Sequence, residues 1–219
     1  MKRIIVLLSI LTLFVTGCSF AKVNDQDISK NVHSMLAEKV SLYNVFYEGY
    51  KYYLPKGVRF INKEEYNAIL KDSYNNRYYL YVDAISYYHK TKNNYEVDPA
   101  SYYSQKIEID KKNGYLQIDK VDNKFFIQFV YHYVKMEAYV DENHLMDTLT
   151  NMCSILRTVK FNKAILESLI GENVLDYKEE DYTLFKADSS KESFLDVVER
   201  EETDLYKKDL EDEKIDLEY

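Results

Sequence analysis

The feature that most constrains the fold is a regular alternation of apolar and polar residues on both sides of an Asn-Gly pair. Ile107–Asp110 alternates before Asn113-Gly114, and Tyr115–Asp119 resumes the alternation after it. A period of two is typical of a strand with one buried face, and Asn-Gly is a strong signal for a tight hairpin turn. The pattern predicts a β-hairpin that turns at Asn113-Gly114, and with it an antiparallel sheet.

Further β-favouring runs extend this sheet in both directions. A turn at Asp122-Asn123 leads into Phe125–Val140, whose 16 residues imply a bend or a bulge partway along the strand. The Pro55-Lys56-Gly57 turn, with Pro at its first central position, joins two of the earlier runs. The other predicted strands are Tyr50–Leu54, Val58–Ile61 and Arg77–Tyr88, the last of them central. Together the runs predict an antiparallel meander.

Four segments predict helices, and the strongest signal comes from Asp141–Arg157. Its apolar residues recur every three or four positions, which gives one stripe to pack on the sheet rather than on a partner helix. The stripe consists of Leu145, Leu149, Met152, Leu156 and Val159. The other predicted helices are Ser34–Leu42, Lys63–Lys71 capped by Asn62, and Lys163–Ile170 capped by Asn162 and ended by Gly171. The expected fold class is α+β, an antiparallel meander covered by helices.

The N-terminus has the pattern of an export signal. Lys2-Arg3 precedes the uncharged, mostly apolar run Ile4–Val15, which at 12 residues is too short for a membrane-spanning helix of about 20. The run ends in Val15-Thr16-Gly17-Cys18, and this pattern resembles a bacterial lipoprotein signal. The resemblance implies cleavage before Cys18 and attachment of a diacylglyceryl group to its thiol, so that this residue anchors the protein in the membrane.

This resemblance sets the expected organisation and location of the chain. We expect a signal peptide at 1–17, a lipidated N-terminus and tether at 18–42, an α+β globular domain at 43–172, and an acidic C-terminal extension at 173–219. The expected location is the cell membrane, where the lipid on Cys18 holds the domain on the extracytoplasmic face.

The net charge is concentrated at the C-terminus. Residues 188–219 hold 13 acidic and 5 basic side chains, which accounts for the whole formal net charge of −8. Nucleic acids and anionic membrane surfaces bind through basic patches, so we expect no nucleic-acid partner. The segment from 190 onward is expected to be a solvated, partly helical extension.

Cysteine and tyrosine usage adds two expectations. Cys153 has no disulfide partner once Cys18 is lipidated, and its place beside the apolar stripe predicts a half-buried small residue. The chain has 23 Tyr and no Trp. These tyrosines are either an aromatic surface for ligands or a consequence of strand preference and codon bias, and we prefer the second interpretation.

The sequence lacks the common patterns of catalytic and metal sites. Its five glycines are too widely separated for a phosphate-binding loop, and its four histidines have no metal-ligand spacing. The nearest constellation is Tyr131-His132-Tyr133 with Glu137, and we interpret His132 as a hydrogen-bonded structural residue. We therefore predict no catalytic residue, no cofactor and no metal, and no enzymatic activity.

The stretch from Tyr52 to Phe161 resembles the PsbP-like α/β sandwich of several small bacterial lipoproteins. The similarity lies in the strand that enters Leu54-Pro55-Lys56-Gly57, in the meander, and in the covering helix that closes with Ile155–Phe161. The resemblance implies a sandwich fold and supplies no catalytic motif.

Three functional hypotheses follow from these observations. The first is a non-catalytic accessory lipoprotein that holds or regulates a protein partner at the membrane. The second is a lipoprotein that binds a small ligand in a Tyr-lined cleft. The third is an enzyme of unrecognised class, which would need His132 or another polar group in a deep pocket beside an acid.

Overall fold

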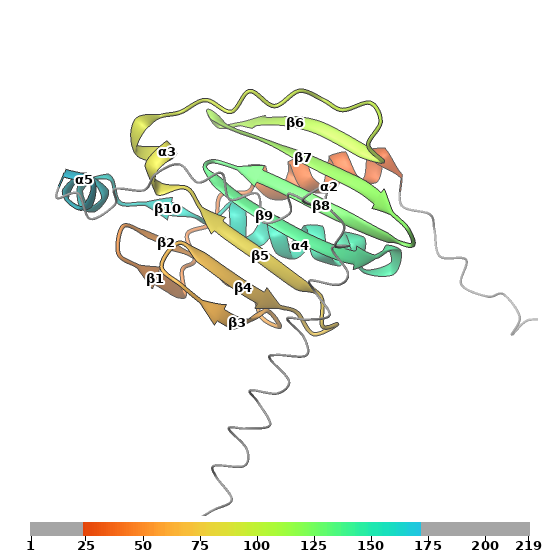
Figure 1. Ribbon diagram of the computed structural model, residues 1–219, viewed down its shortest axis with the longest axis horizontal. Coiled ribbons are helices and arrows are strands. Elements are labelled where there is room, and N and C mark those ends of the chain that lie inside the picture. The colour runs from red at the N-terminus through yellow and green to blue at the C-terminus, as the bar shows by residue number, and fades with distance from the viewer. Residues whose placement is uncertain (1–23, 172–219) are drawn as a thin grey trace, which may run out of the picture. The chain divides into compact units, whose positions relative to one another are not determined.

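Two antiparallel sheets and four α-helices make up the part of the chain that the computed structural model describes, residues 24–171 (Figure 1). This confirms the predicted α+β class. The signal peptide, the anchor residue Cys18 and the acidic extension from 173 lie outside the described residues, so their predicted roles stay predictions. Between residues 24 and 171 no helix has the length and apolar character needed to span a bilayer.

The larger sheet has seven strands in the order β3-β4-β5-β9-β8-β7-β6, with every neighbouring pair antiparallel. Its strands are β3 (Arg59–Lys63), β4 (Asn67–Lys71), β5 (Arg77–Val82), β6 (Tyr103–Ile109), β7 (Lys112–Val121), β8 (Lys124–Tyr131) and β9 (Val134–Asp141). Two meanders, β3 to β5 and β6 to β9, are joined where β5 pairs with β9. The predicted meander is therefore present and is wider than the sequence indicated.

The hairpin between β6 and β7 turns at a different place from the predicted one. Asp110 and Lys111 form the turn, with φ of 52° and 65°. Asn113 and Gly114 instead lie inside β7, and a Cβ on Gly114 would come within 2.0 Å of the carbonyl oxygen of Val130. The glycine is needed because β7 and β8 approach closely there, not because the chain reverses.

The long run Phe125–Val140 is also divided differently. It forms two eight-residue strands, β8 and β9, joined by a turn at His132 and Tyr133, whose φ values are 49° and 66°. Positive φ at both central residues suits the right-handed twist of a hairpin, but neither residue type signals it. The turn predicted at Asp122, between β7 and β8, is confirmed.

Two predictions in the first half of the sheet are wrong. Lys63–Lys71 is not a helix, because its second half forms β4, where Ala68 and Leu70 alternate into the core. Asn62 therefore caps no helix. The run Arg77–Tyr88 remains a strand only to Val82, after which the side chain of Asp83 accepts from Ser86 N at 2.8 Å and starts helix α3 (Ala84–His89).

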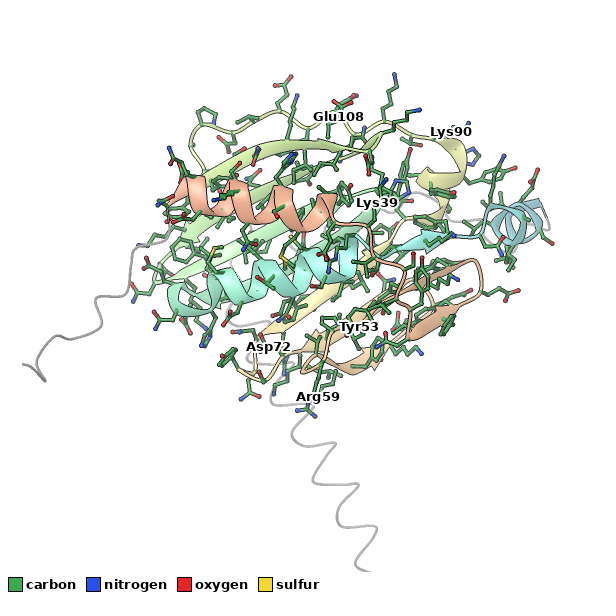
Figure 2. All side chains as sticks on the ribbon, turned by 180° about the vertical axis from the view of Figure 1, so that it is seen from behind. Lys39, Tyr53, Arg59, Asp72, Lys90 and Glu108 are labelled. Atoms are coloured by element: carbon green, nitrogen blue, oxygen red, sulfur yellow. The ribbon has the colours of Figure 1, made fainter. Side chains whose placement is uncertain are left out.

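Helices α2 (Asp25–Ala37) and α4 (Leu145–Leu156) cover one face of the larger sheet and pack on each other (Figure 2). The predicted apolar stripe of α4 is buried, and Cys153 beside it is fully buried rather than half-buried. Burial raises the pKa of the Cys153 thiol to about 12. The predicted covering helix is therefore confirmed, with a short 3-10 turn (Glu142–His144) before it.

Helix α2 begins well before the predicted helix Ser34–Leu42 and ends at Ala37. The side chain of Asn24 accepts from Asp27 N at 2.9 Å, and Ile28, Val32 and Leu36 are buried. Residues 25–37, expected within the tether, therefore contribute to the domain core.

A smaller sheet, with the strand order β1-β2-β10, lies beside the larger one (Figure 1). Its strands are β1 (Val45–Tyr47), β2 (Tyr50–Tyr52) and β10 (Lys160–Phe161), and helix α5 (Lys163–Gly171) follows directly. Asn162 caps α5 as predicted, since its side chain accepts from Ile165 N at 3.4 Å. The turn after β2 has Pro55 at its first position rather than its first central one, because Val58 N donates to Pro55 O.

Six tyrosines of the described chain are buried in the core: Tyr50, Tyr52, Tyr66, Tyr78, Tyr103 and Tyr131. They belong to one buried hydrophobic cluster, in which the ring of Tyr50 stacks with the rings of Tyr52 and Tyr66. These six tyrosines thus serve the fold.

Candidate binding groove

The constellation singled out in the sequence, Tyr131-His132-Tyr133 with Glu137, is divided between separate local clusters. The ring of His132 lies edge-on to Tyr87 and Phe161, at centroid distances of 5.8 and 5.9 Å. Burial, with a smaller contribution from Lys112, lowers the pKa of His132 to about 4. The neutral imidazole of His132 thus packs against neighbouring rings and stabilises the β8–β9 turn.

Glu137 lies in the middle of β9, opposite Gln128 on β8 and Tyr79 on β5. It is 1% exposed, and its carboxylate accepts from Gln128 Nε2 at 3.0 Å and pairs with Lys135 Nζ at 3.1 Å. The described contacts of Glu137 are thus with its strand neighbours, and none of them joins it to His132.

A second buried carboxylate, Asp72, organises the turn between β4 and β5. It accepts from the backbone N–H groups of Tyr74 and Asn76, from the Asn76 amide, and from the Tyr78 hydroxyl at 2.7 Å. Asn151 on α4 donates to the same hydroxyl at 3.1 Å. Burial, followed by the bond to Asp72, raises the pKa of Tyr78. The network ties helix to sheet.

No group of three or more His, Cys, Asp or Glu side chains within residues 24–171 is arranged to hold a metal ion. Two of the grooves formed by the described residues are considered as candidate sites, and the sequence predicted the lining of neither.

The first, the polar groove, has a volume of about 590 Å³. It lies between β6 and the loop before it. It is lined by Asn93, Asn94, Tyr95, Glu96, Lys106, Ile107, Glu108, Asn113 and Gly114. The ring of Tyr95 already stacks on Tyr115 at 3.9 Å, and its hydroxyl donates to Gln117 at 2.9 Å. The ring and hydroxyl of Tyr95 thus hold the loop before β6 in place on β7.

The second, the small-sheet groove, has a volume of about 460 Å³ and lies between the smaller sheet and the start of α5. It is lined by Phe46, Tyr47, Gly49, Tyr50, Lys51, Lys160, Phe161, Asn162, Lys163, Ala164 and Ile165. Aromatic, aliphatic and cationic side chains are therefore combined in one concave surface, and no lining residue is acidic.

Backbone pairing fixes the inner wall of the small-sheet groove. Gly49 has φ of 92°, and a Cβ on it would lie 2.5 Å from Leu166 Cδ2, so glycine allows α5 to pack against the β1–β2 turn. Asn162 N donates to Gly49 O at 2.7 Å. The rings of Tyr47 and Tyr50 stack at 4.8 Å behind this turn. The wall is therefore held in place before any ligand arrives.

The outer face of the smaller sheet carries a row of three paired residues. Phe46 on β1 is opposite Lys51 on β2, and Lys51 is opposite Lys160 on β10. Phe46 is 65% exposed, the largest exposed fraction among the large apolar side chains of residues 24–171. A large apolar side chain and two cations thus lie side by side on the surface.

The positive charge of this row has no counter-ion among the described residues. Lys51, Lys160 and Lys163 make no ion pair there, and the nearest described contact of Lys51 Nζ is the ring of Tyr43, at 4.2 Å from its centroid. Like charges that face each other across strands repel, so the row costs stability when nothing is bound.

Sequence reasoning missed this groove for a physical reason. Lys51 and Lys160 are more than a hundred residues apart in the chain, and only the pairing of β2 with β10 brings them together. The exposed position of Phe46 left no local signal either, because Val45-Phe46-Tyr47 is a continuous apolar run, and only the pairing of β1 with β2 places Phe46 on the outer face.

Comparisons with known proteins give no information on what the small-sheet groove binds. No protein-family model matches the sequence, and no curated protein is significantly similar to it.

Proposed function

We propose that the protein is a lipid-anchored, non-catalytic module that binds a partner protein on the extracytoplasmic face of the membrane. The lipoprotein-like sequence that ends at Cys18 supports the anchorage. The small-sheet groove supports the binding, because it joins a preformed wall to exposed apolar and charged side chains.

The observation that carries the proposal is the exposure of Phe46 beside the groove. Burying an aromatic side chain of this size releases about 1.5–3 kcal/mol, and the free protein leaves most of that unused. Ile165, 36% exposed on α5, extends the apolar surface into the same groove. Exposed apolar residues that adjoin a concave surface are typical of protein-binding sites.

Site-specific photo-crosslinking tests the proposal. Phe46→p-benzoylphenylalanine in the full chain, produced in its host, is expected to give one discrete adduct with a membrane or exported protein. Mass spectrometry then identifies the attached peptide, and the binding of that peptide to the purified full chain is measured by fluorescence anisotropy.

The matched control is Val121→p-benzoylphenylalanine. Val121 is also an exposed apolar residue, but it adjoins the β7–β8 turn, at the opposite end of β8 from His132 and Phe161. Adducts that are equal at both positions, or a captured peptide that does not bind the purified protein, would contradict the proposal.

A second candidate function is binding of a small ligand in the same groove, since Tyr47, Tyr50 and Phe161 line it. Aromatic rings with a few polar groups are common in such sites. This candidate predicts a thermal shift of the full chain with some sugar, peptide or lipid headgroup, and loss of that shift in Phe46→Ala. An unchanged melting temperature across a broad panel of such ligands would contradict this candidate function.

A further inference from the structure

We infer that the small-sheet groove selects an acidic segment of its partner, with a bulky apolar residue as the anchor. This inference rests on the proposed function and adds the chemistry of the bound segment. The apolar residue is expected against Phe46 and Ile165, and the carboxylates beside Lys51, Lys160 and Lys163.

Charge complementarity determines the choice of an acidic segment. Three lysines line the groove, and neither a lining carboxylate nor a described ion pair balances them. Carboxylates placed beside the row would remove the repulsion between Lys51 and Lys160 and add their own attraction. A basic segment would increase that repulsion, and a neutral one would leave it in place.

The apolar lining of the groove is the reason for expecting a bulky apolar residue in the bound segment. Phe46 and Ile165 approach the groove from β1 and α5, two elements that are fixed to each other through Gly49. A leucine or an aromatic residue placed between them would lose its own exposed surface and cover part of theirs. Interface hot spots of this kind are usually an apolar anchor in a pocket, with charged groups at the rim.

One acidic residue adjoins the site without lining it. Glu48 lies in the β1–β2 turn between Tyr47 and Gly49, and it is exposed. Its charge opposes the binding of an acidic segment, so Glu48→Gln is expected to strengthen binding by about twofold, the effect of one screened surface charge.

A defined peptide series tests the inference on the full chain, purified in detergent. The probe is a fluorescein-labelled decapeptide of Glu and Asp residues around a central Leu-Phe pair. One comparison peptide replaces the acids with Gln and Asn, and another replaces Leu-Phe with Ala-Ala. Anisotropy is measured at low and at high salt.

We expect the acidic Leu-Phe peptide to bind most tightly and to lose affinity as salt rises. The triple variant Lys51→Gln, Lys160→Gln, Lys163→Gln should weaken its binding about tenfold, because three exposed ion pairs together amount to roughly that factor. Phe46→Ala should weaken binding of the Leu-Phe peptide and leave the Ala-Ala peptide unchanged. Phe46, Lys160 and Lys163 are exposed and Lys51 is half-buried, and melting temperatures no lower than that of the unmodified protein would confirm that each variant folds.

The control triple variant is Lys39→Gln, Lys92→Gln, Lys106→Gln. It removes the same charge at exposed positions away from the small-sheet groove, and Lys106 belongs to the polar groove. It should bind the probe as the unmodified protein does. Equal losses in the two triple variants would overturn the inference, because they would show a general effect of net charge.

The two proposals fail in different ways. If Phe46→p-benzoylphenylalanine captures a genuine partner whose bound segment is neutral or basic, the inference is overturned and the proposed function stands. If no groove-dependent adduct forms, the proposed function fails. Absence of probe binding to the unmodified chain, or sedimentation showing a Phe46-dependent dimer, would also overturn the inference.

Discussion

The two sheets differ in how their polar groups are satisfied. In the larger sheet, the buried carboxylates of Asp72 and Glu137 accept hydrogen bonds from Tyr78 on β5 and Gln128 on β8, and the second oxygen of Glu137 is buried without a hydrogen bond among the described residues. On the smaller sheet, Lys51 and Lys160 face each other without a described counter-ion, beside an exposed Phe46. The described carboxylates of the larger sheet are thus bonded within the fold, whereas the outer face of the smaller sheet leaves two cations unpaired among the described residues and one aromatic ring exposed.

The largest expected difference is between apolar residues of the two regions. Leu149 on α4 is fully buried, so Leu149→Ala should lower the free energy of unfolding by about 2–5 kcal/mol. Phe46→Ala should change it by less than about 0.5 kcal/mol. Urea denaturation of the two variants measures both values. A similar loss of stability in each would contradict the difference between the buried core and the exposed face of the smaller sheet.

A smaller effect is expected from the Asp72 network. Asp72→Asn would turn an accepting oxygen into a donating nitrogen that faces the Asn76 amide and the Tyr78 hydroxyl, at a cost of about 1–3 kcal/mol. Asp98→Asn is the matched control, because this exposed loop carboxylate accepts, among the described residues, from the backbone N–H of Ala100 alone, and it should cost less than about 0.5 kcal/mol. Equal losses of stability in urea titrations would show that the buried Asp72 network does not cause the loss in Asp72→Asn.

The pH dependence of stability should report on His132. Its folded pKa of about 4 lies below its unfolded value, so the unfolded state binds more protons between these values. Stability should therefore fall as pH drops from about 6.5 to 4, by about 1–2 kcal/mol once solvent screening of this partly exposed ring is allowed for. His132→Phe should remove that slope, and exposed His89→Gln should keep it. A slope that persists in His132→Phe would assign it to another group.

The smallest expected effect has the opposite sign. Lys160→Gln removes one member of the facing lysine pair and should stabilise the free protein by about 0.2–0.5 kcal/mol at low salt. The gain should shrink as salt screens the charges. Lys92→Gln, an exposed loop position, should show no gain, and a Lys160→Gln variant that is less stable would mean that its charge is already balanced.

Local signals in the sequence predicted the parts of the fold that local physics determines. The apolar stripe of α4, the turn at Asp122 and the Asn162 cap each depend on residues a few positions apart. Lys63–Lys71 was misread as a helix because its β4 half depends on pairing with β3 and β5, which overrides local propensity.

The hairpin turns show a subtler failure of local reasoning. Asn113-Gly114 has the residue types of a turn, but the observed turn at Asp110-Lys111 brings this pair inside β7. The small-sheet groove could not be predicted from the sequence for a related reason, since no local pattern could place Lys160 beside Lys51. Both depend on strand register, which a single sequence does not determine.

The pairing of β5 with β9 has a consequence for the order of folding. The hairpins from β6 to β9 close loops of only two residues, whereas β5 meets β9 across about fifty residues of chain. Closing a long loop carries a larger entropic cost, so the four-strand hairpin series can form early, with β3 to β5 joining later. The rate of folding should therefore respond more to substitutions in the β7–β8 pair than to equally destabilising ones in β3.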